Sequence, residues 1–135
     1  MITREEKEKI RCLEKEIGYS FRKIGLLKRA LTHKSFANEK KLPAEEHNER
    51  LEFLGDAVLE LAVSELLMDR YPGFSEGDLS KMRAAIVNEK QLAGLARSFH
   101  LGEYLYLGRG EEQTSGREKN SLLADAYEAI LGGIY

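Results

Sequence analysis

The sequence predicts an all-α fold, and three observations support this class. Apolar residues recur at spacings of three and four along most of the 135 residues, which is the period of a helix, and no alternating strand pattern of any length occurs. Capping residues and glycines stand at the ends of these segments. Only two prolines occur, so long helices are allowed. A chain of this length is expected to form one domain over residues 1–135.

The N-terminal third predicts two helices and a loop. Thr3 followed by Glu6 is a capping-box pattern, so a first helix is expected to begin there and to end at Gly18. A second helix is expected over about residues 24–33, where leucines and alanines recur at helical spacing. Residues 35–46 are polar and contain a proline, which predicts a loop with room for a turn of helix.

The longest helix is expected over about residues 46–70 and is stopped by Pro72 and Gly73. Apolar side chains surround it, which is typical of a helix in the middle of a domain or at a subunit contact. Capping residues then predict shorter helices from Ser75 and from Asn88. These further helices are expected over about residues 75–87, 88–99 and 118–135, with a glycine-rich polar loop at 108–116.

Composition excludes several classes of protein. No apolar run approaches the ~18–20 residues of a membrane span, and no signal-peptide core follows the charged N-terminus. The single cysteine, Cys12, excludes an internal disulfide and suits a reducing compartment, and we expect it to be packed in the first helix. These features predict a cytoplasmic protein without a membrane partner. The net charge of −2 neither supports nor excludes nucleic acid, because it includes carboxylates that a metal would neutralise.

The most informative segment covers residues 48–59, Asn-Glu-Arg-Leu-Glu-Phe-Leu-Gly-Asp-Ala-Val-Leu. Glu49, Glu52 and Asp56 are three and four residues apart, so on a helix they fall within an arc of ~60°. Like charges at this spacing destabilise a helix by roughly 0.2–0.5 kcal/mol per pair, and burial without a partner costs several times more. A divalent metal is the simplest counter-charge for such a stripe.

A second acidic pair lies near the C-terminus. Asp125 and Glu128 are spaced i, i+3 on one face of the last helix, among apolar residues. If this helix packs on the long one, Glu52 and Asp56 converge with them, and four carboxylates suit Mg²⁺ or Mn²⁺. The alternative is two separate, solvated acidic faces. A site of this kind can hydrolyse a phosphodiester without a protein nucleophile.

Both acidic segments resemble motifs of the ribonuclease III family. Residues 48–59 resemble its signature run, and residues 124–130, Ala-Asp-Ala-Tyr-Glu-Ala-Ile, resemble its second acidic motif. The resemblance implies the helical fold of the family's endonuclease domain, a homodimer, and Mg²⁺-dependent hydrolysis of double-stranded RNA, with Mn²⁺ as a substitute. The implied products carry 5′-phosphate and 3′-hydroxyl ends with a short 3′ overhang, as in the processing of ribosomal RNA precursors. Weaker matches lie at residues 30–36, 77–80 and 83–89.

The resemblance also implies roles for individual acids. The metal-binding residues would be Glu52, Asp56, Asp125 and Glu128. Asp56 and Glu128 would be catalytic, and loss of Glu128 is expected to abolish cleavage while sparing RNA binding. Glu49 matches a further family acid in a supporting role, with an ordinary polar residue in the first helical turn as the alternative.

Contacts with partners are predicted at fewer positions. By resemblance, Phe53 would insert into a pocket of a second, identical subunit, and a plain core phenylalanine is the alternative. Basic residues in loops or beside the motifs are candidates for RNA phosphate contacts, although solvated surface residues are the simpler reading. These candidates are Lys34, Arg83 and Lys119. The histidines show no metal-ligand spacing, and packing or capping roles are expected for His33, His47 and His100.

Full-length bacterial members of this family usually continue into a separate double-stranded-RNA-binding domain, whereas this sequence stops at Tyr135. We therefore expect the catalytic domain alone, either truncated or naturally short. The alternative function is a non-catalytic double-stranded-RNA-binding or scaffold module of the same fold. All four motif acids are present, which disfavours that alternative.

Overall fold

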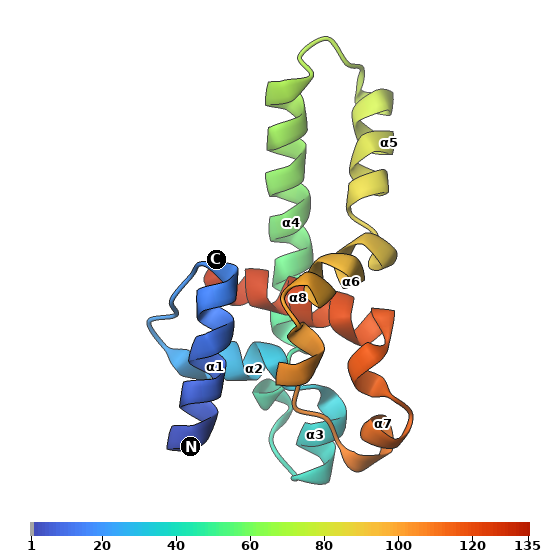
Figure 1. Ribbon diagram of the computed structural model, residues 1–135. Coiled ribbons are helices and arrows are strands. Elements are labelled where there is room, and N and C mark those ends of the chain that lie inside the picture. Colours follow the sequence, from blue (N-terminus) through green and yellow to red (C-terminus); the bar gives the residue numbers. More distant parts are fainter. Residues whose placement is uncertain (1) are drawn as a thin grey trace.

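The structure is a computed structural model that describes residues 2–135, so Met1, the first residue of the expected domain, lies outside the described part. The described residues form helices joined by short connections, and their one β-bridge pairs Thr32 with Tyr106. The all-α class is therefore confirmed. In chain order (Figure 1) the elements are α1 (Arg4–Ile17), α2 (Ile24–Leu31), α3 (Lys34–Glu39), η1 (Ala44–Glu46), α4 (Glu49–Arg70), α5 (Glu76–Ile86), α6 (Glu89–Ser98), η2 (Leu101–Tyr104), α7 (Arg109–Gln113), η3 (Gly116–Glu118) and α8 (Asn120–Ile134).

Local capping chemistry sets the helix ends as expected. The Glu6 backbone N–H donates to the Thr3 hydroxyl at 3.1 Å, and the Glu6 carboxylate accepts the Thr3 N–H at 2.8 Å, which completes the capping box of α1. Gly18, at φ 74°, ends that helix in the left-handed conformation that glycine adopts without steric cost. Ser75 and Asn88 cap α5 and α6 through their side-chain oxygens.

One expected helix end is wrong, and the two expected loops contain short helices, of which a turn in the first loop was allowed for. The second helix ends at Leu31 because the next residues extend to meet a distant segment, where the Tyr106 N–H donates to the Leu31 carbonyl at 2.9 Å. The expected loop at 35–46 contains α3 and η1, and the loop at 108–116 contains α7. Helices this short span fewer than two turns, so they carry no apolar periodicity that a sequence can show.

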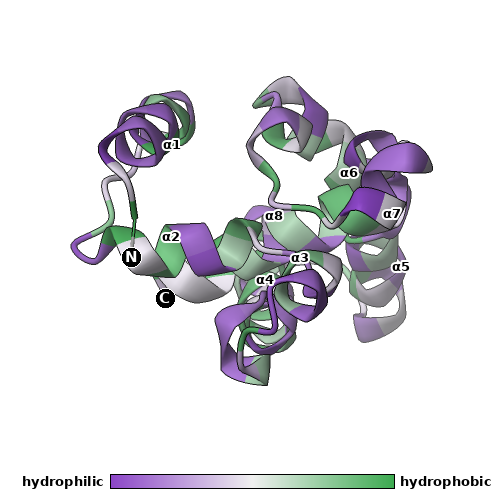
Figure 2. Ribbon diagram, turned by 90° about the horizontal axis from the view of Figure 1, so that it is seen from below, coloured by the Kyte–Doolittle hydropathy of each residue, from purple (hydrophilic) through white to green (hydrophobic). Residues whose placement is uncertain are grey.

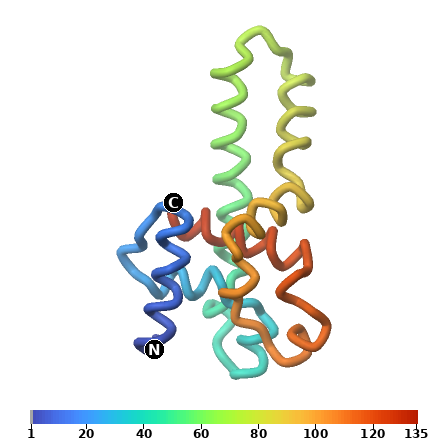
Figure 3. The backbone as a smooth tube through the Cα atoms, in the orientation of Figure 1, coloured from blue at the N-terminus to red at the C-terminus, as the bar shows by residue number. Residues whose placement is uncertain are grey.

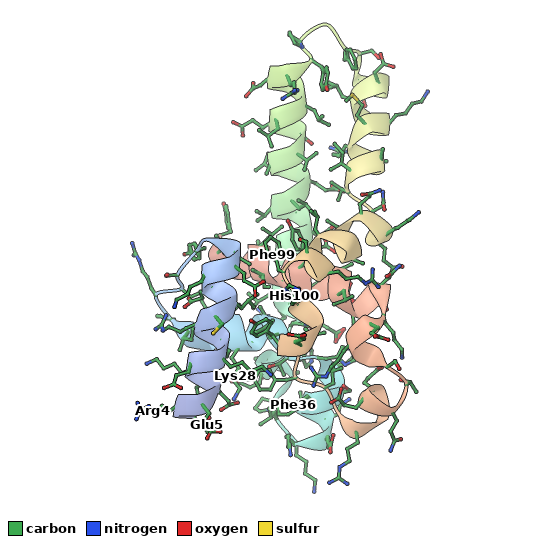
Figure 4. All side chains as sticks on the ribbon, in the orientation of Figure 1. Arg4, Glu5, Lys28, Phe36, Phe99 and His100 are labelled. Atoms are coloured by element: carbon green, nitrogen blue, oxygen red, sulfur yellow. The ribbon has the colours of Figure 1, made fainter. Side chains whose placement is uncertain are left out.

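The core lies where α2 and α6 pack on α8, with α1 packed on α2 and η2. Its largest fully buried side chains are Ile10, Leu13, Leu27, Leu31, Leu101 and Leu123. Seen from below, the largely hydrophobic α8 runs through the centre, while hydrophilic residues of α1 and α7 lie at the periphery (Figure 2). Lys28 of α2, labelled in Figure 4, links α2 to α1 by an ion pair with Glu6 at 3.0 Å.

Cys12 is exposed, which corrects the expectation that it is packed. Ile10 and Leu13 of the same helix point into the core. At ~100° per residue, position 12 is rotated by ~200° from position 10, so its side chain faces away from the core.

The long helix α4 is far less buried than its composition predicts. Within the described chain only Gly55 and Leu67 of this helix are buried, whereas Leu61 is 65% exposed. Only its N-terminal part crosses α8, and its remainder extends from the body beside α5 as a hairpin (Figures 1 and 3). Of the two expected settings for this helix, the middle of the domain is therefore wrong, and a subunit contact stays a prediction. None of the helices in residues 2–135 combines the length and the apolar character needed to cross a lipid bilayer.

Candidate metal centre

The candidate site forms where the backbones of α4 and α8 touch. A Cβ atom on Gly55 would overlap the backbone carbonyl of Glu128, and one on Gly132 would overlap the carbonyl of Leu51. Glycine at both positions therefore permits an approach that any larger residue would prevent. This crossing brings the acidic stripe of one helix onto the acidic face of the other.

Three carboxylates from the two helices meet at the crossing. Glu52, Asp125 and Glu128 each offer an oxygen, and these oxygens all lie within 4.8 Å of one another. The carboxyl groups of Asp56 and Glu128 are close enough to share a hydrogen bond when one of them is protonated. The four motif acids thus form one group, called the acid cluster below, although Glu52 and Glu128 are 76 residues apart in the sequence.

Burial and mutual repulsion raise the pKa values of carboxyl groups in this cluster. Burial, followed by the hydrogen bond and charge of Asp56, raises the pKa of Glu128 to about 8. Burial and the neighbouring Asp125 raise the pKa of Glu52 to about 7. The pKa of Asp125 is also raised, chiefly by burial. Without a cation, the cluster is therefore only partly ionised at neutral pH.

A divalent cation fits the polar atoms of the cluster. Glu128 is only 9% exposed, and its Oε2 atom is buried without a hydrogen-bond partner. Among residues 2–135, no lysine or arginine forms an ion pair with any of the four carboxylates. A buried carboxylate oxygen normally needs a partner, and hard cations prefer all-oxygen ligands. The residues present therefore suit Mg²⁺ or Mn²⁺.

Glu49 lies beside the acid cluster and not within it. Its exposed carboxylate is 3.8 Å from Nε2 of His47, and it lines a small groove of about 280 Å³ together with Glu52 and Asp125. This groove, called the acid groove below, is lined by His33, Lys34, Asn48, Glu49, Glu52, Glu111, Ser121, Leu122 and Asp125.

The three candidate RNA-contacting residues are placed differently. Lys34 is exposed and lines the acid groove. The Lys119 ammonium donates to the Glu111 carboxylate and to the Thr114 hydroxyl, both at 3.0 Å, so it already has partners. Arg83 donates to the Ser64 hydroxyl at 2.8 Å inside the α4–α5 hairpin. Of the three, only Lys34 adjoins the acids.

Sequence reasoning assigned His33 to packing or capping, yet this half-buried residue also lines the acid groove. Its ring does cap a helix, because Nδ1 accepts the Ser35 N–H at 3.1 Å. The sequence held one signal for a further role: His33 lies within the 30–36 segment that weakly matches the family.

Phe53 projects into solvent from α4, the helix that also carries the acidic residues Glu49, Glu52 and Asp56. It is 83% exposed, so the alternative of a core phenylalanine is wrong within this chain. Beside it lies a wider groove of about 1010 Å³, here called the Phe53 groove. Its lining includes Arg29, His47, Leu51, Phe53 and Leu54.

Comparison with known proteins places this chain in a family. A family profile described as Ribonuclease-III-like matches residues 23–135. Curated proteins named Ribonuclease 3 from Pelotomaculum thermopropionicum and Myxococcus xanthus are each 52% identical to the chain over 128 residues, which is 95% of this chain. The same alignments cover 53% and 49% of those proteins, so the chain spans about half the length of these relatives.

Solved structures agree with this placement. The nuclease domain of ribonuclease III from Campylobacter jejuni matches with a TM-score of 0.86 at 50% identity, covering 93% of this chain and 83% of that one. That study describes flexibility in its region involved in dimer formation. Dicer from Pichia stipitis matches with a TM-score of 0.61 at 28% identity over 85% of this chain and 46% of that one. The profile match covers most of the sequence, and this protein therefore belongs to the ribonuclease-III-like family.

Proposed function

We propose that residues 1–135 form the catalytic domain of an endonuclease that hydrolyses double-stranded RNA with Mg²⁺, for which Mn²⁺ can substitute. The observation that carries this proposal is the convergence of Glu52, Asp125 and Glu128, whose oxygens lie within 4.8 Å of one another, with Asp56 beside them. The names of the curated relatives support ribonuclease activity.

Each acid has a definite task in this proposal. Glu52, Asp56, Asp125 and Glu128 hold the metal, and the buried Glu128 and its neighbour Asp56 contribute most directly to catalysis. A divalent ion held by these acids would supply the positive charge that offsets the phosphate and lowers the pKa of a water for attack. The exposed Glu49 supports the cluster from the edge of the acid groove, where Lys34 is available to contact an RNA phosphate. The products are 5′-phosphate and 3′-hydroxyl ends with a short 3′ overhang, and precursors of ribosomal RNA are a suitable substrate class.

We further propose a homodimer in which the Phe53 ring of each subunit enters the Phe53 groove of the other. An isologous interface requires the projecting group and its receptor on the same face of one chain, and Phe53 and its groove meet that condition. Two acid clusters in such a dimer would each cut one strand of an RNA duplex. A reducing compartment, the cytoplasm, is consistent with the single exposed cysteine.

The test is the substitution Glu128→Gln, assayed by gel electrophoresis of a duplex RNA in saturating Mg²⁺. Glutamine matches the protonated carboxyl in size and lacks the charge that holds the ion. We expect cleavage to fall by roughly 10²–10³-fold or more, with duplex binding retained. The matched control is Glu60→Gln, which changes an exposed acid of the same helix outside the cluster.

Two results would count against the proposal. Unchanged turnover in Glu128→Gln would remove this residue from the mechanism. Duplex binding by the wild-type chain without any Mg²⁺-dependent cleavage would instead favour the non-catalytic RNA-binding module.

A further inference from the structure

His33 joins three segments that surround the acid groove. Its backbone N–H donates to the Tyr106 carbonyl at 3.0 Å, and its Nδ1 atom accepts the Ser35 N–H at 3.1 Å. The Ser35 hydroxyl lies 2.7 Å from the same Nδ1 atom and accepts the Gly108 N–H at 2.9 Å. The imidazole is therefore held at its Nδ1 edge by Ser35 of α3, which is itself bonded to the 106–108 segment.

These contacts define which ring nitrogen carries the proton. An amide N–H can only donate, so Nδ1 of His33 must be the acceptor. Burial lowers the pKa of His33, so the ring is neutral at neutral pH and its single proton is on Nε2. None of the described residues accepts a hydrogen bond from that nitrogen. One oriented donor of the ring is thus left for a ligand.

The surroundings of His33 indicate what this ligand is. The residue lines the compact acid groove beside Lys34 and Ser121, and the same groove is lined by the carboxylates of Glu49, Glu52, Glu111 and Asp125. The amide of Asn48, another lining residue, is already bonded to the Ala30 carbonyl at 3.1 Å. A phosphate whose charge is offset by a metal at the acid cluster would present its remaining oxygens to the donors of His33, Lys34 and Ser121.

We propose that His33 donates a hydrogen bond from Nε2 to a non-bridging phosphate oxygen of the RNA strand held at the acid cluster. The inference rests on the proposed function, and it adds a substrate contact to a residue whose helix-capping role uses only the other nitrogen. A neutral donor has an advantage here over a second cation, since it forms no ion pair with the neighbouring carboxylates in the absence of RNA.

Two substitutions separate the capping role from the phosphate contact. Asparagine places an acceptor oxygen where Nδ1 lies and has no atom at Nε2, so His33→Asn retains the cap and removes the donor. The side chain of glutamine is long enough to place an N–H near the position of Nε2, but it has no acceptor at the position of Nδ1. His33→Gln therefore retains the donor and removes the cap. The control is His100→Asn, because His100 is an exposed residue outside the groove with φ 55°, a conformation that asparagine tolerates (Figure 4).

The measurements are the melting temperature and kcat/KM on a duplex RNA in Mg²⁺. We expect His33→Asn to melt like the wild type while its kcat/KM falls roughly ten- to a hundred-fold, the effect of losing one hydrogen bond to a charged group. His33→Gln should melt at a lower temperature and retain more of kcat/KM than His33→Asn. His100→Asn should match the wild type in both measurements.

Wild-type cleavage by His33→Asn would overturn the inference, as would a kcat/KM that follows the melting temperature in both variants. Failure of the wild-type chain itself to cleave duplex RNA would be a different result, because it would overturn the proposed function.

Discussion

The carboxyl group of Glu128 connects the stability of this protein to its chemistry. The Glu128 carboxylate is buried beside the carboxyl of Asp56, and both burial and this neighbour disfavour its charged form. Its pKa therefore rises to about 8. Its Oε2 atom is also buried without a hydrogen-bond partner. Residues placed in this way are typical of functional sites, where strain is retained because a ligand relieves it.

This residue predicts how stability depends on pH. Between the unfolded pKa of 4.5 and the folded pKa of about 8, the native state of Glu128 binds more protons than the unfolded state. The free energy of unfolding of the metal-free protein should therefore decrease as pH rises through this interval. In Glu128→Gln the decrease should be smaller, and at pH 8 this variant should be at least as stable as the wild type. Urea unfolding in EDTA at a series of pH values measures both.

Metal binding should reverse this loss. At pH 8, Mg²⁺ should raise the melting temperature of the wild type, because an ion that binds only the folded state stabilises it. The increase should be absent or much smaller in Glu128→Gln, and it should persist in the Glu60→Gln control. An equal increase in wild type and Glu128→Gln would show that the ion binds elsewhere.

At the scale of single helices, capping residues were the most reliable predictors. Thr3, Ser75 and Asn88 each begin a helix where the sequence predicts it. The short helix α3 lies where the sequence allowed for a turn of helix, whereas α7 was not predicted, because its start depends on a distant partner. The N–H of Arg109 at the start of α7 donates to the Glu39 carboxylate at 2.8 Å.

The sequence raised a contact between the long helix and the last helix as one of two alternatives, and it did not indicate how their backbones approach so closely. The two glycines at the crossing, Gly55 and Gly132, gave no signal in the sequence alone, since helical glycine is often merely tolerated. In the structure they determine how closely the carboxylates approach. The candidate site residues could therefore be named from spacing and resemblance, but their distances and pKa values depend on the packing.

The substitution Gly55→Ala tests this packing. Its new methyl group would overlap the Glu128 backbone carbonyl, so α4 and α8 must move apart. We expect the free energy of unfolding to fall by roughly 1–3 kcal/mol or more, with a loss of cleavage as the acids separate. Gly94→Ala is the matched control, because beyond its own helix backbone nothing lies within 4 Å of the added methyl group and alanine favours a helix by about 1 kcal/mol. A Gly55→Ala protein as stable as the wild type would contradict this account.

At the scale of the whole molecule, the exposed apolar residues of α4 indicate a surface that one chain leaves uncovered. Leu61 and Leu66 are 65% and 67% exposed, and Phe53 is 83% exposed. The sequence predicted either a central helix or a subunit contact, because both kinds of helix are apolar on most sides. Only the structure shows that the helix is not central.

The proposed dimer makes a quantitative prediction for Phe53. Burying one phenylalanine is worth about 1.5–3 kcal/mol, and a two-fold axis counts each substitution twice. Phe53→Ala should therefore weaken dimerisation by about 3–6 kcal/mol, which is on the order of 10²–10⁴-fold in the dimer dissociation constant. Sedimentation equilibrium over a range of protein concentrations measures this constant. Tyr135→Ala removes another exposed aromatic residue, 81% exposed and outside the Phe53 groove, and should leave the constant unchanged.

The melting temperature of the monomer and its metal affinity separate the possible causes of a change. Because Phe53 contacts solvent in the single chain, its removal should not alter the packing of α4 on α8. A Phe53→Ala protein that dissociates while its monomer still binds Mg²⁺ would place this residue at the interface alone. A wild-type chain that stays monomeric at every concentration, or a Phe53→Ala dimer as tight as the wild type, would show that something other than this ring covers the exposed face of α4.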